Sequence, residues 1–192
     1  MTLADPAART VASPSSEIRR PDKAGRLEAC ATTVISRSPA ATRRLGEAMG
    51  RMARLGDVIG LVGPLGAGKT EMVKGIAQGM GIGETVVTSP TFVLMQIYDG
   101  KIPLYHIDLY RWAGDDVGLD DAIFGDGVVV IEWADRSRDL SGRDLLPPDR
   151  LWVTIRYTQG KERAITVTRD APDGGAWICR MEQTWTTLAD KR

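Results

Sequence analysis

A glycine-rich segment between an apolar run and an amphipathic helix constrains the fold of this chain more than any other feature. Segment 63–70 reads Gly-Pro-Leu-Gly-Ala-Gly-Lys-Thr and fits the phosphate-binding loop pattern G-x-x-x-x-G-K-[ST]. The apolar run 58–62 precedes it, as expected of a buried parallel strand. Apolar residues at helical spacing follow, and two glycines then end the helix: Met72, Val73, Ile76, Ala77 and Met80, then Gly81 and Gly83. Strand, glycine loop and helix in this order predict a phosphate-binding site.

Each part of this segment has a chemical role in holding phosphate. Glycines let backbone N–H groups converge on phosphate oxygens, and the N-terminus of the following helix adds a favourable partial charge. Lys69 is predicted to reach the terminal phosphates of a nucleotide, and the Thr70 hydroxyl to bind Mg²⁺. The flanking strand and helix disfavour the alternative, a glycine-rich turn with a solvated lysine. The residues predicted to surround the phosphates are Gly63, Pro64, Leu65, Gly66, Ala67, Gly68, Lys69 and Thr70.

Composition narrows the class of protein and its compartment. The chain has 192 residues, and its 25 basic residues balance its 25 acidic ones, so no overall field recruits nucleic acid or an anionic membrane. The chain has only two cysteines, Cys30 and Cys179, which disfavours a disulfide framework. Their separation in sequence does not match the spacing of metal ligands. No run is long enough to span a membrane. We therefore expect a cytoplasmic protein with reduced thiols.

Three regions follow from the distribution of apolar residues. Residues 1–29 are rich in Ala, Ser, Pro, Arg and Asp without periodicity, which predicts a disordered N-terminal extension; its acidic residues disfavour a targeting peptide. Residues 30–169 hold the phosphate loop and the other periodic segments and are predicted to form one nucleotide-binding domain. Residues 170–192 are expected to be a loosely ordered tail, although Trp177, Ile178 and Trp185 offer groups with which it can dock.

The periodic segments predict an α/β fold, a three-layer P-loop NTPase domain with a mixed, mainly parallel central sheet. A helix is predicted to begin at Ser38-Pro39 and to bury one face: Leu45, Ala48, Met49 and Met52. The signal Asp99-Gly100 predicts a hairpin between two strands, and a polar turn around Gln159-Gly160 predicts a second. The predicted strands are 31–36, 58–62, 93–98, 102–107, 128–131, 151–157 and 164–168, with a short helix or loop at 114–127.

Two carboxylates follow apolar strands and are candidates to orient magnesium or an attacking water. Glu132 ends the run Val-Val-Val-Ile-Glu, and Asp108 ends Leu-Tyr-His-Ile-Asp. A phosphate loop needs such a group at the end of a nearby buried strand. The alternative is a strand-end ion pair, because Arg111 lies near Asp108 in sequence and Arg136 near Glu132. The phosphate loop favours the functional interpretation for both.

Three further residues near these strands have weaker signals. Thr91 lies in a loop between strands, where its hydroxyl either senses the terminal phosphate or magnesium or serves as an ordinary turn residue. His106, the only histidine, is predicted to pack or hydrogen-bond within a strand, since no second histidine can join it as a metal ligand. Trp133 is predicted to pack in the core, with stacking on a base or a partner as the minority interpretation.

The sequence favours ATP but leaves the reaction open. The chain contains no asparagine, so the Asn-Lys-x-Asp guanine reader of many GTPases is absent. The first hypothesis is an ATPase that transfers phosphate to water. A small-molecule kinase is the second, with an arginine lid drawn from Arg136, Arg138 and Arg143. A nucleotide-gated adaptor with negligible hydrolysis is the third.

Several segments together resemble one family, the bacterial TsaE-type ATPases of tRNA threonylcarbamoyladenosine biosynthesis. The phosphate loop is generic, whereas Ser-Pro-Thr-Phe and His-x-Asp-Leu-Tyr-Arg in this order and spacing are far more specific. The resemblance covers about residues 30–169. The matching segments are Thr-Arg-Arg-Leu-Gly at 42–46, the phosphate loop at 63–70, Ser-Pro-Thr-Phe at 89–92, Leu-Tyr-His-Ile-Asp-Leu-Tyr-Arg at 104–111, and Glu-Trp at 132–133.

The resemblance implies a cytoplasmic ATPase that uses ATP and Mg²⁺ and works with TsaB and TsaD homologues. Those partners place a threonylcarbamoyl group on adenosine 37 of tRNAs that read codons beginning with A, and ATP hydrolysis resets the complex, so tRNA is engaged indirectly. It further implies that Lys69 holds phosphates, that Thr70 and Glu132 serve magnesium and that Asp108 lies at the nucleotide. Thr91 would belong to a switch-like loop, and Thr42 would lie near the nucleotide.

One residue of the loop and the residue that follows it depart from the family pattern. Pro64 stands where aspartate is common, and Glu71, also expected at the nucleotide, stands where threonine or serine is frequent. Glu71 puts a carboxylate near the phosphates, although a helix N-terminus tolerates negative charge. We expect these changes to bear on nucleotide affinity and not on family.

Overall fold

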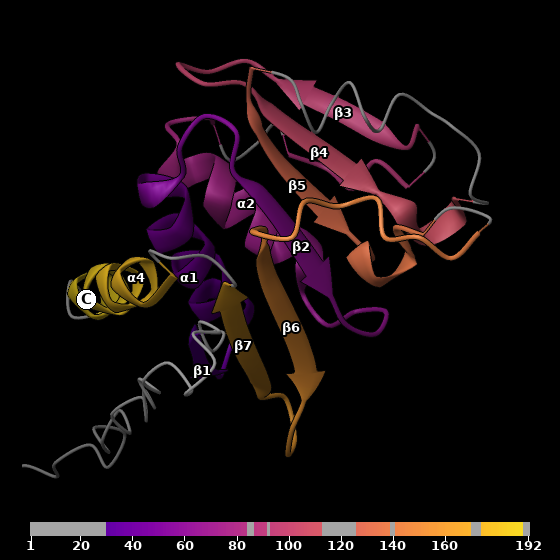
Figure 1. The fold of residues 1–192 in the computed structure, drawn as a ribbon. Helices are drawn as coiled ribbons and strands as arrows, with labels where there is room; N and C mark the ends of the chain where they lie inside the picture. Colours follow the sequence, from indigo (N-terminus) through magenta and orange to yellow (C-terminus); the bar gives the residue numbers. More distant parts are fainter. Residues whose placement is uncertain are drawn as a thin grey trace, which may run out of the picture.

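A computed structural model describes residues 30–83, 87–91, 93–112, 126–138, 141–169 and 174–189. The predicted extension at 1–29 lies outside these residues, as do most of segment 114–127 and Phe92 of the predicted loop. The described residues form a seven-stranded sheet, helices and connecting loops (Figure 1).

The sheet is mixed, as the sequence predicts, but it is not mainly parallel. The strand order is β1-β7-β6-β2-β5-β4-β3. The pairs β6–β2, β2–β5 and β5–β4 are parallel, whereas β1–β7, β7–β6 and β4–β3 are antiparallel. Short turns join only antiparallel strands, so the two predicted hairpins themselves limit the parallel part to the centre. The strands are β1 (Cys30–Ser36), β2 (Val58–Val62), β3 (Met95–Tyr98), β4 (Leu104–Asp108), β5 (Val128–Glu132), β6 (Leu151–Tyr157) and β7 (Arg163–Arg169).

The described α-helices all pack on one face of the sheet. They are α1 (Pro39–Met52), α2 (Lys69–Gly79) and α4 (Gly174–Ala189). Central strands alternate between the two faces: Val128 and Val130 join the core under the helices, and Val129 and Ile131 join a second core. Among the described residues, the second core is covered by the 3₁₀ turns η2 (Leu109–Arg111) and η3 (Ala134–Arg136) and by loop residues such as Leu146. The helical third layer that the sequence predicts is therefore not formed by the described part of the chain.

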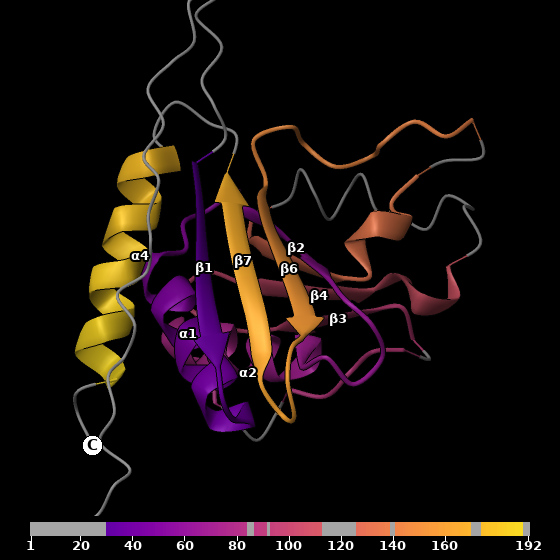
Figure 2. The ribbon, with the colours of Figure 1, turned by 90° about the horizontal axis from the view of Figure 1, so that it is seen from below.

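The C-terminal helix α4 corrects the expectation of a loosely ordered tail. Trp177, Ile178 and Met181 are buried in the main core, and α4 contacts α1, β1 and β7 (Figure 2). These three apolar residues lie on one side of a helix at i, i+1 and i+4, a spacing that the two preceding glycines obscure in the sequence. Within the described residues, no helix has the length and apolarity needed to cross a bilayer.

Helices α1 and α2 touch through glycines that have no room for a side chain. A Cβ on Gly75 would lie 2.0 Å from the Arg43 carbonyl oxygen, and one on Gly50 would lie 2.1 Å from that of Ile76. Contacts this short are incompatible with any real side chain, so the backbones of the two helices approach directly. The phosphate loop enters α2, and α1 therefore supports the first turn of α2 from behind.

Gly75→Ala is expected to destabilise the protein, because the added methyl group forces α1 and α2 apart. Overpacking of this kind costs about 1–3 kcal/mol and exceeds the gain of roughly 1 kcal/mol in helix propensity. Urea unfolding should show a lower midpoint. Gln78→Ala, an exposed substitution on the same helix, is the matched control and should leave the midpoint nearly unchanged. Equal midpoints for both variants would contradict the close helix contact.

Candidate functional site

Three parallel strands end at the same edge of the sheet, and the predicted site residues gather there. Strand β2 leads into the phosphate loop, β5 ends at Glu132, and β4, on the far side of β5, ends at Asp108 (Figure 1). Ligands of open α/β sheets bind outside the carboxyl ends of the strands. The cavity at this edge has a volume of about 330 Å³ and is lined by Leu65, Gly66, Ala67, Gly68, Lys69, Thr70, Glu71, Ser89, Thr91, Asp108, Tyr110, Glu132 and Trp133.

The loop between β2 and α2 has a backbone that only glycine accommodates at its key positions. Gly68 caps α2 with φ 109°, which is unfavourable for residues with a Cβ. A Cβ on Gly63 would lie 2.4 Å from the carbonyl oxygen of Ile155 on β6. Because no side chain caps α2, the N–H groups of its first turn remain available at the cavity. This is the anion-binding arrangement that the pattern predicts.

The Lys69 ammonium lies inside the curve of the loop. Its Nζ donates to the carbonyl oxygens of Gly63 at 2.7 Å and Pro64 at 3.0 Å and sits 3.6 Å from the centre of the Trp133 ring. Burial lowers the pKa of Lys69, and the nearby carboxylates of Glu132 and Asp108 oppose that shift. The site therefore holds a partly desolvated cation, the environment in which attraction to a phosphate is strongest.

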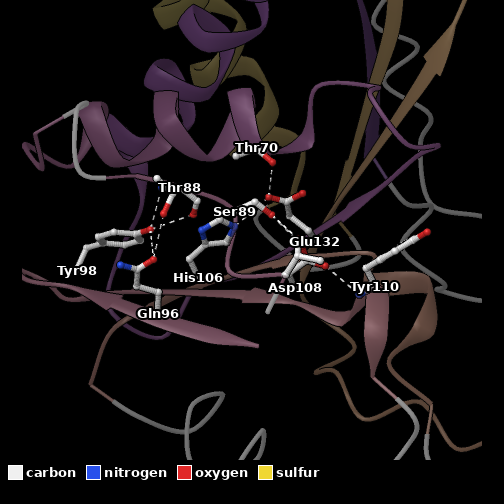
Figure 3. A network of polar contacts seen from close by, with 10 residues as sticks. Thr70, Thr88, Ser89, Gln96, Tyr98, His106, Asp108, Tyr110 and Glu132 are labelled. Atoms are coloured by element: carbon white, nitrogen blue, oxygen red, sulfur yellow. Dashed lines mark hydrogen bonds and ion pairs between the residues drawn. The ribbon is translucent and has the colours of Figure 1, made fainter. Parts of the chain in front are cut away.

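Glu132 lies between the phosphate-loop threonine and the histidine of β4 (Figure 3). The Thr70 hydroxyl donates to Glu132 Oε1 at 2.8 Å, and His106 Nε2 lies 3.0 Å from the same oxygen. A carboxylate oxygen only accepts, so Nε2 is the donor nitrogen of His106 in this contact. His106 is fully buried in β4 and contacts Glu132, which confirms the prediction that it packs or hydrogen-bonds within a strand. Both of these bonds from the described residues are made to Oε1 of Glu132, so its Oε2 remains available at the cavity.

Asp108 anchors the loop that contains Ser89 and Thr91. Both hydroxyls donate to Asp108 Oδ2, at 2.9 Å and 2.6 Å, and the backbone N–H of Tyr110 donates to Oδ1 at 2.8 Å. Asp108 is thus a buried acceptor for two segments far apart in sequence (Figure 3). The predicted loop residue Thr91 faces the cavity, and its present partner is Asp108.

A tyrosine that the sequence analysis did not single out fixes the start of the same loop. The Tyr98 hydroxyl accepts from Thr88 N at 3.3 Å and donates toward Thr88 O at 3.2 Å and Gln96 Oε1 at 3.0 Å. Its ring lies 6.3 Å from that of His106. Its only sequence signal was its place at the end of a hairpin strand, beside the predicted turn.

Trp133 packs in the core, as predicted. It packs against the second core and also lines the cavity, where its ring lies 5.0 Å from that of Tyr110. Its backbone is left-handed, with φ 59°, an uncommon conformation for a bulky residue that turns the chain sharply after β5. Arg136 lies 5.1 Å from both aromatic rings.

Some predicted residues lie beside the cavity and not in its wall. Thr42 is buried behind the loop: its hydroxyl is 2.8 Å from Ser36 Oγ, and its methyl group would be 3.7 Å from a Cβ on Gly68. Thr42 thus supports the loop, and its place does not support direct contact with a nucleotide. Gly63 and Pro64 contribute carbonyl groups to Lys69. The described cavity wall includes none of the candidate lid residues, Arg136, Arg138 and Arg143.

Comparison with known proteins identifies the family. The family described as "Threonylcarbamoyl adenosine biosynthesis protein TsaE" matches residues 36–165. The chain belongs to the TsaE family. The tRNA threonylcarbamoyladenosine biosynthesis protein TsaE of Treponema pallidum is 42% identical over 137 residues, which are 69% of this chain and 97% of that protein. TsaE of Bacillus subtilis is 41% identical over 134 residues, 68% of this chain and 81% of that protein.

A solved structure agrees with the family assignment. The crystal structure of YdiB from Bacillus subtilis superposes with a TM-score of 0.68 at 32% identity and covers 81% of this chain and 97% of that one. The motif resemblance is therefore confirmed at the level of family and of a mixed α/β fold.

The donor set of this TsaE-family site fits a magnesium ion that is partly held by phosphate. Magnesium prefers oxygen ligands, keeps several waters and commonly binds through one or two carboxylates plus substrate phosphates. The Thr70 hydroxyl and Glu132 Oε2 supply two such oxygens at one edge of the cavity. Among the described residues, no cluster of three or more His, Cys, Asp or Glu is able to hold a metal by itself.

Proposed function

We propose that this TsaE-family chain binds ATP with Mg²⁺ and hydrolyses it to sustain multiple-turnover threonylcarbamoylation of adenosine 37 in tRNA by TsaB and TsaD homologues. One observation carries the proposal: Lys69, Thr70 and Glu132 converge at the ends of adjacent parallel strands around one cavity. The names of the two TsaE relatives supply the pathway.

Binding rests on the loop and the first turn of α2. Their N–H groups would hold the inner phosphates, and Lys69 would exchange its contacts with Gly63 and Pro64 for the terminal phosphates. The absence of asparagine from the chain excludes the Asn-Lys-x-Asp guanine reader and supports ATP over GTP.

Hydrolysis rests on the carboxylate at the end of β5. When bound through Thr70 and Glu132, Mg²⁺ would neutralise charge on the phosphates. Glu132 would orient the attacking water with Oε2, while His106 keeps Oε1 in place. His106 would retain the carboxylate even when the Thr70 hydroxyl turns toward the metal.

The Ser89–Thr91 loop supplies a route for partner control. Its two hydroxyls are bound to Asp108 at the cavity wall, so a terminal phosphate competes with Asp108 for them. A partner that draws these hydroxyls away from Asp108 would complete the site and raise the rate. The kinase alternative is less favoured because no candidate lid arginine lines the described cavity.

A reconstitution with TsaB and TsaD homologues and tRNA tests this function. The isolated chain should release phosphate slowly without any acceptor, and the partners should raise that rate. Modified adenosines per complex should exceed one only when the chain and ATP are present. Full multiple turnover without the chain would overturn the pathway role, and phosphate transfer to a small molecule in place of water would support a kinase.

His106→Leu is expected to slow hydrolysis about tenfold while changing ATP affinity by less than about threefold. The substitution keeps the volume of the buried side chain but removes the donor to Glu132 Oε1, and bonds to charged groups contribute roughly 1.5–3 kcal/mol. His106→Gln retains an N–H near the position of Nε2 and should recover most of the rate. Single-turnover kinetics measure the rate of hydrolysis, and calorimetry measures the affinity for ATP. Equal rates for Leu and Gln variants would contradict a positioning role.

A further inference from the structure

Glu71 lines the cavity, and its carboxylate is held by two cations. Its Oε2 accepts from Arg43 Nη2 at 2.6 Å, and its Oε1 accepts from Lys74 Nζ at 2.8 Å. Arg43 comes from α1, whereas Lys74 lies one turn further along α2. All three side chains are about a quarter to a third exposed, and Glu71 itself lines the cavity.

The packing of the helices fixes this cluster in place. The Arg43 backbone lies directly against Gly75, one turn after Glu71, and the arginine side chain reaches back along α2 to the carboxylate. Partial burial raises the pKa of Glu71, but the hydrogen bonds from Lys74 and Arg43 outweigh it and leave the pKa below its usual value. The carboxylate therefore stays ionised at neutral pH.

Glu71 faces the opposite side of the helix terminus from the catalytic carboxylate. Thr70 bonds to Glu132 across the cavity, while the next residue turns toward α1. If the terminal phosphate lies at Lys69 and Glu132, the inner phosphates lie on the side of Glu71, because the N–H groups in the first turn of α2 hold those phosphates. The inner phosphates are common to ATP and ADP. The negative charge of Glu71 therefore repels both nucleotides. It also pairs with Arg43 and Lys74, the two cations that would otherwise attract the phosphates.

We propose that Glu71 sets nucleotide affinity at this site by competing with the inner phosphates for Arg43 and Lys74, so that the chain holds both ATP and its diphosphate product weakly. This inference rests on the proposed nucleotide site and adds a residue that tunes it. Weak retention of the diphosphate suits a protein that must exchange nucleotide between turnovers. Arg43 and Lys74 move from the carboxylate to the phosphates when a nucleotide binds.

Two substitutions that break the same ion pair give opposite results under this proposal. Glu71→Gln should tighten ATP and ADP about tenfold each, because one like charge is removed and two cations are released beside the phosphates. Arg43→Gln should weaken the binding of both nucleotides several-fold. Glu71 then keeps its negative charge, and one of the two cations that would attract the phosphates is gone. A purely structural ion pair predicts a loss in both variants.

Calorimetric titration of the full chain with MgATP and with MgADP measures these changes. Glu47→Gln is the matched control: it breaks the Arg51–Glu47 pair of 2.5 Å on α1 and should leave both dissociation constants within twofold. Weaker binding by Glu71→Gln, or no change in it, would overturn the inference while the wild-type chain still binds ATP. A wild-type chain that binds no nucleotide would overturn the proposed function and this inference together.

Discussion

Lys69→Ala is expected to abolish measurable nucleotide binding and to lower ATP hydrolysis at least about 100-fold. Lys69 is the buried cation of the cavity, held between two loop carbonyl groups and the face of Trp133. Its charge acts where water is largely excluded, and removal of a single preorganised group of this kind costs about 10²–10³ in rate. Calorimetry should detect no heat of ATP binding, and phosphate release should fall to background with the partners present.

Two controls separate this result from a folding defect. Lys101→Ala removes an exposed lysine from the β3–β4 turn and should keep wild-type binding and turnover. The thermal midpoint of Lys69→Ala should show that the chain still folds, because the strand pairing of the sheet and its two buried apolar cores do not involve the ammonium. Near wild-type turnover in a folded Lys69→Ala chain would end the phosphate-loop assignment.

The parts of the site that the sequence predicts are those with local signals. The loop is identified by glycine spacing between a strand and a helix, and Glu132 and Asp108 are identified by their place after apolar runs. The sheet then brings these carboxylates together, because Asp108 and Glu132 are register partners in the parallel pair β4–β5. Sequence alone does not give that register, so their proximity is a consequence of the fold.

The sequence does not predict which distant segments contact one another. His106 reaches Glu132 only because β4 and β5 are neighbours, and Tyr98 reaches Thr88 only after the hairpin folds back on the loop. The docking of α4 is a similar case: the sequence offers Trp177 and Ile178 as docking groups, but the surface that receives them exists only once α1 and β1 are in place. The Arg43–Glu71 pair requires the close approach of two helices that Gly75 permits.

Glu132→Gln is expected to leave ATP binding within a few-fold of wild type and to slow hydrolysis about 100-fold or more. The amide keeps the shape of the side chain, and its oxygen still accepts from Thr70 and His106. What is lost is the negative charge on the oxygen that faces the cavity. In the wild-type chain that oxygen would orient the attacking water and serve as one ligand of magnesium. Positioned acid–base groups contribute about 10²–10⁴ in rate, so the loss falls on the chemical step. Single-turnover phosphate release with saturating MgATP measures it directly.

Substitution of other carboxylates tests whether Glu132 alone orients the attacking water. Glu162→Gln breaks an exposed ion pair with Arg37 and should leave hydrolysis unchanged. Asp108→Asn should act differently from Glu132→Gln: it weakens the attachment of Ser89 and Thr91 and should alter the response to partners more than the intrinsic rate. If Glu132→Gln hydrolyses ATP at the wild-type rate with partners present, the water must be oriented by another carboxylate. Asp135, whose charge acts on Lys69 from the adjoining turn, would then be the next residue to substitute.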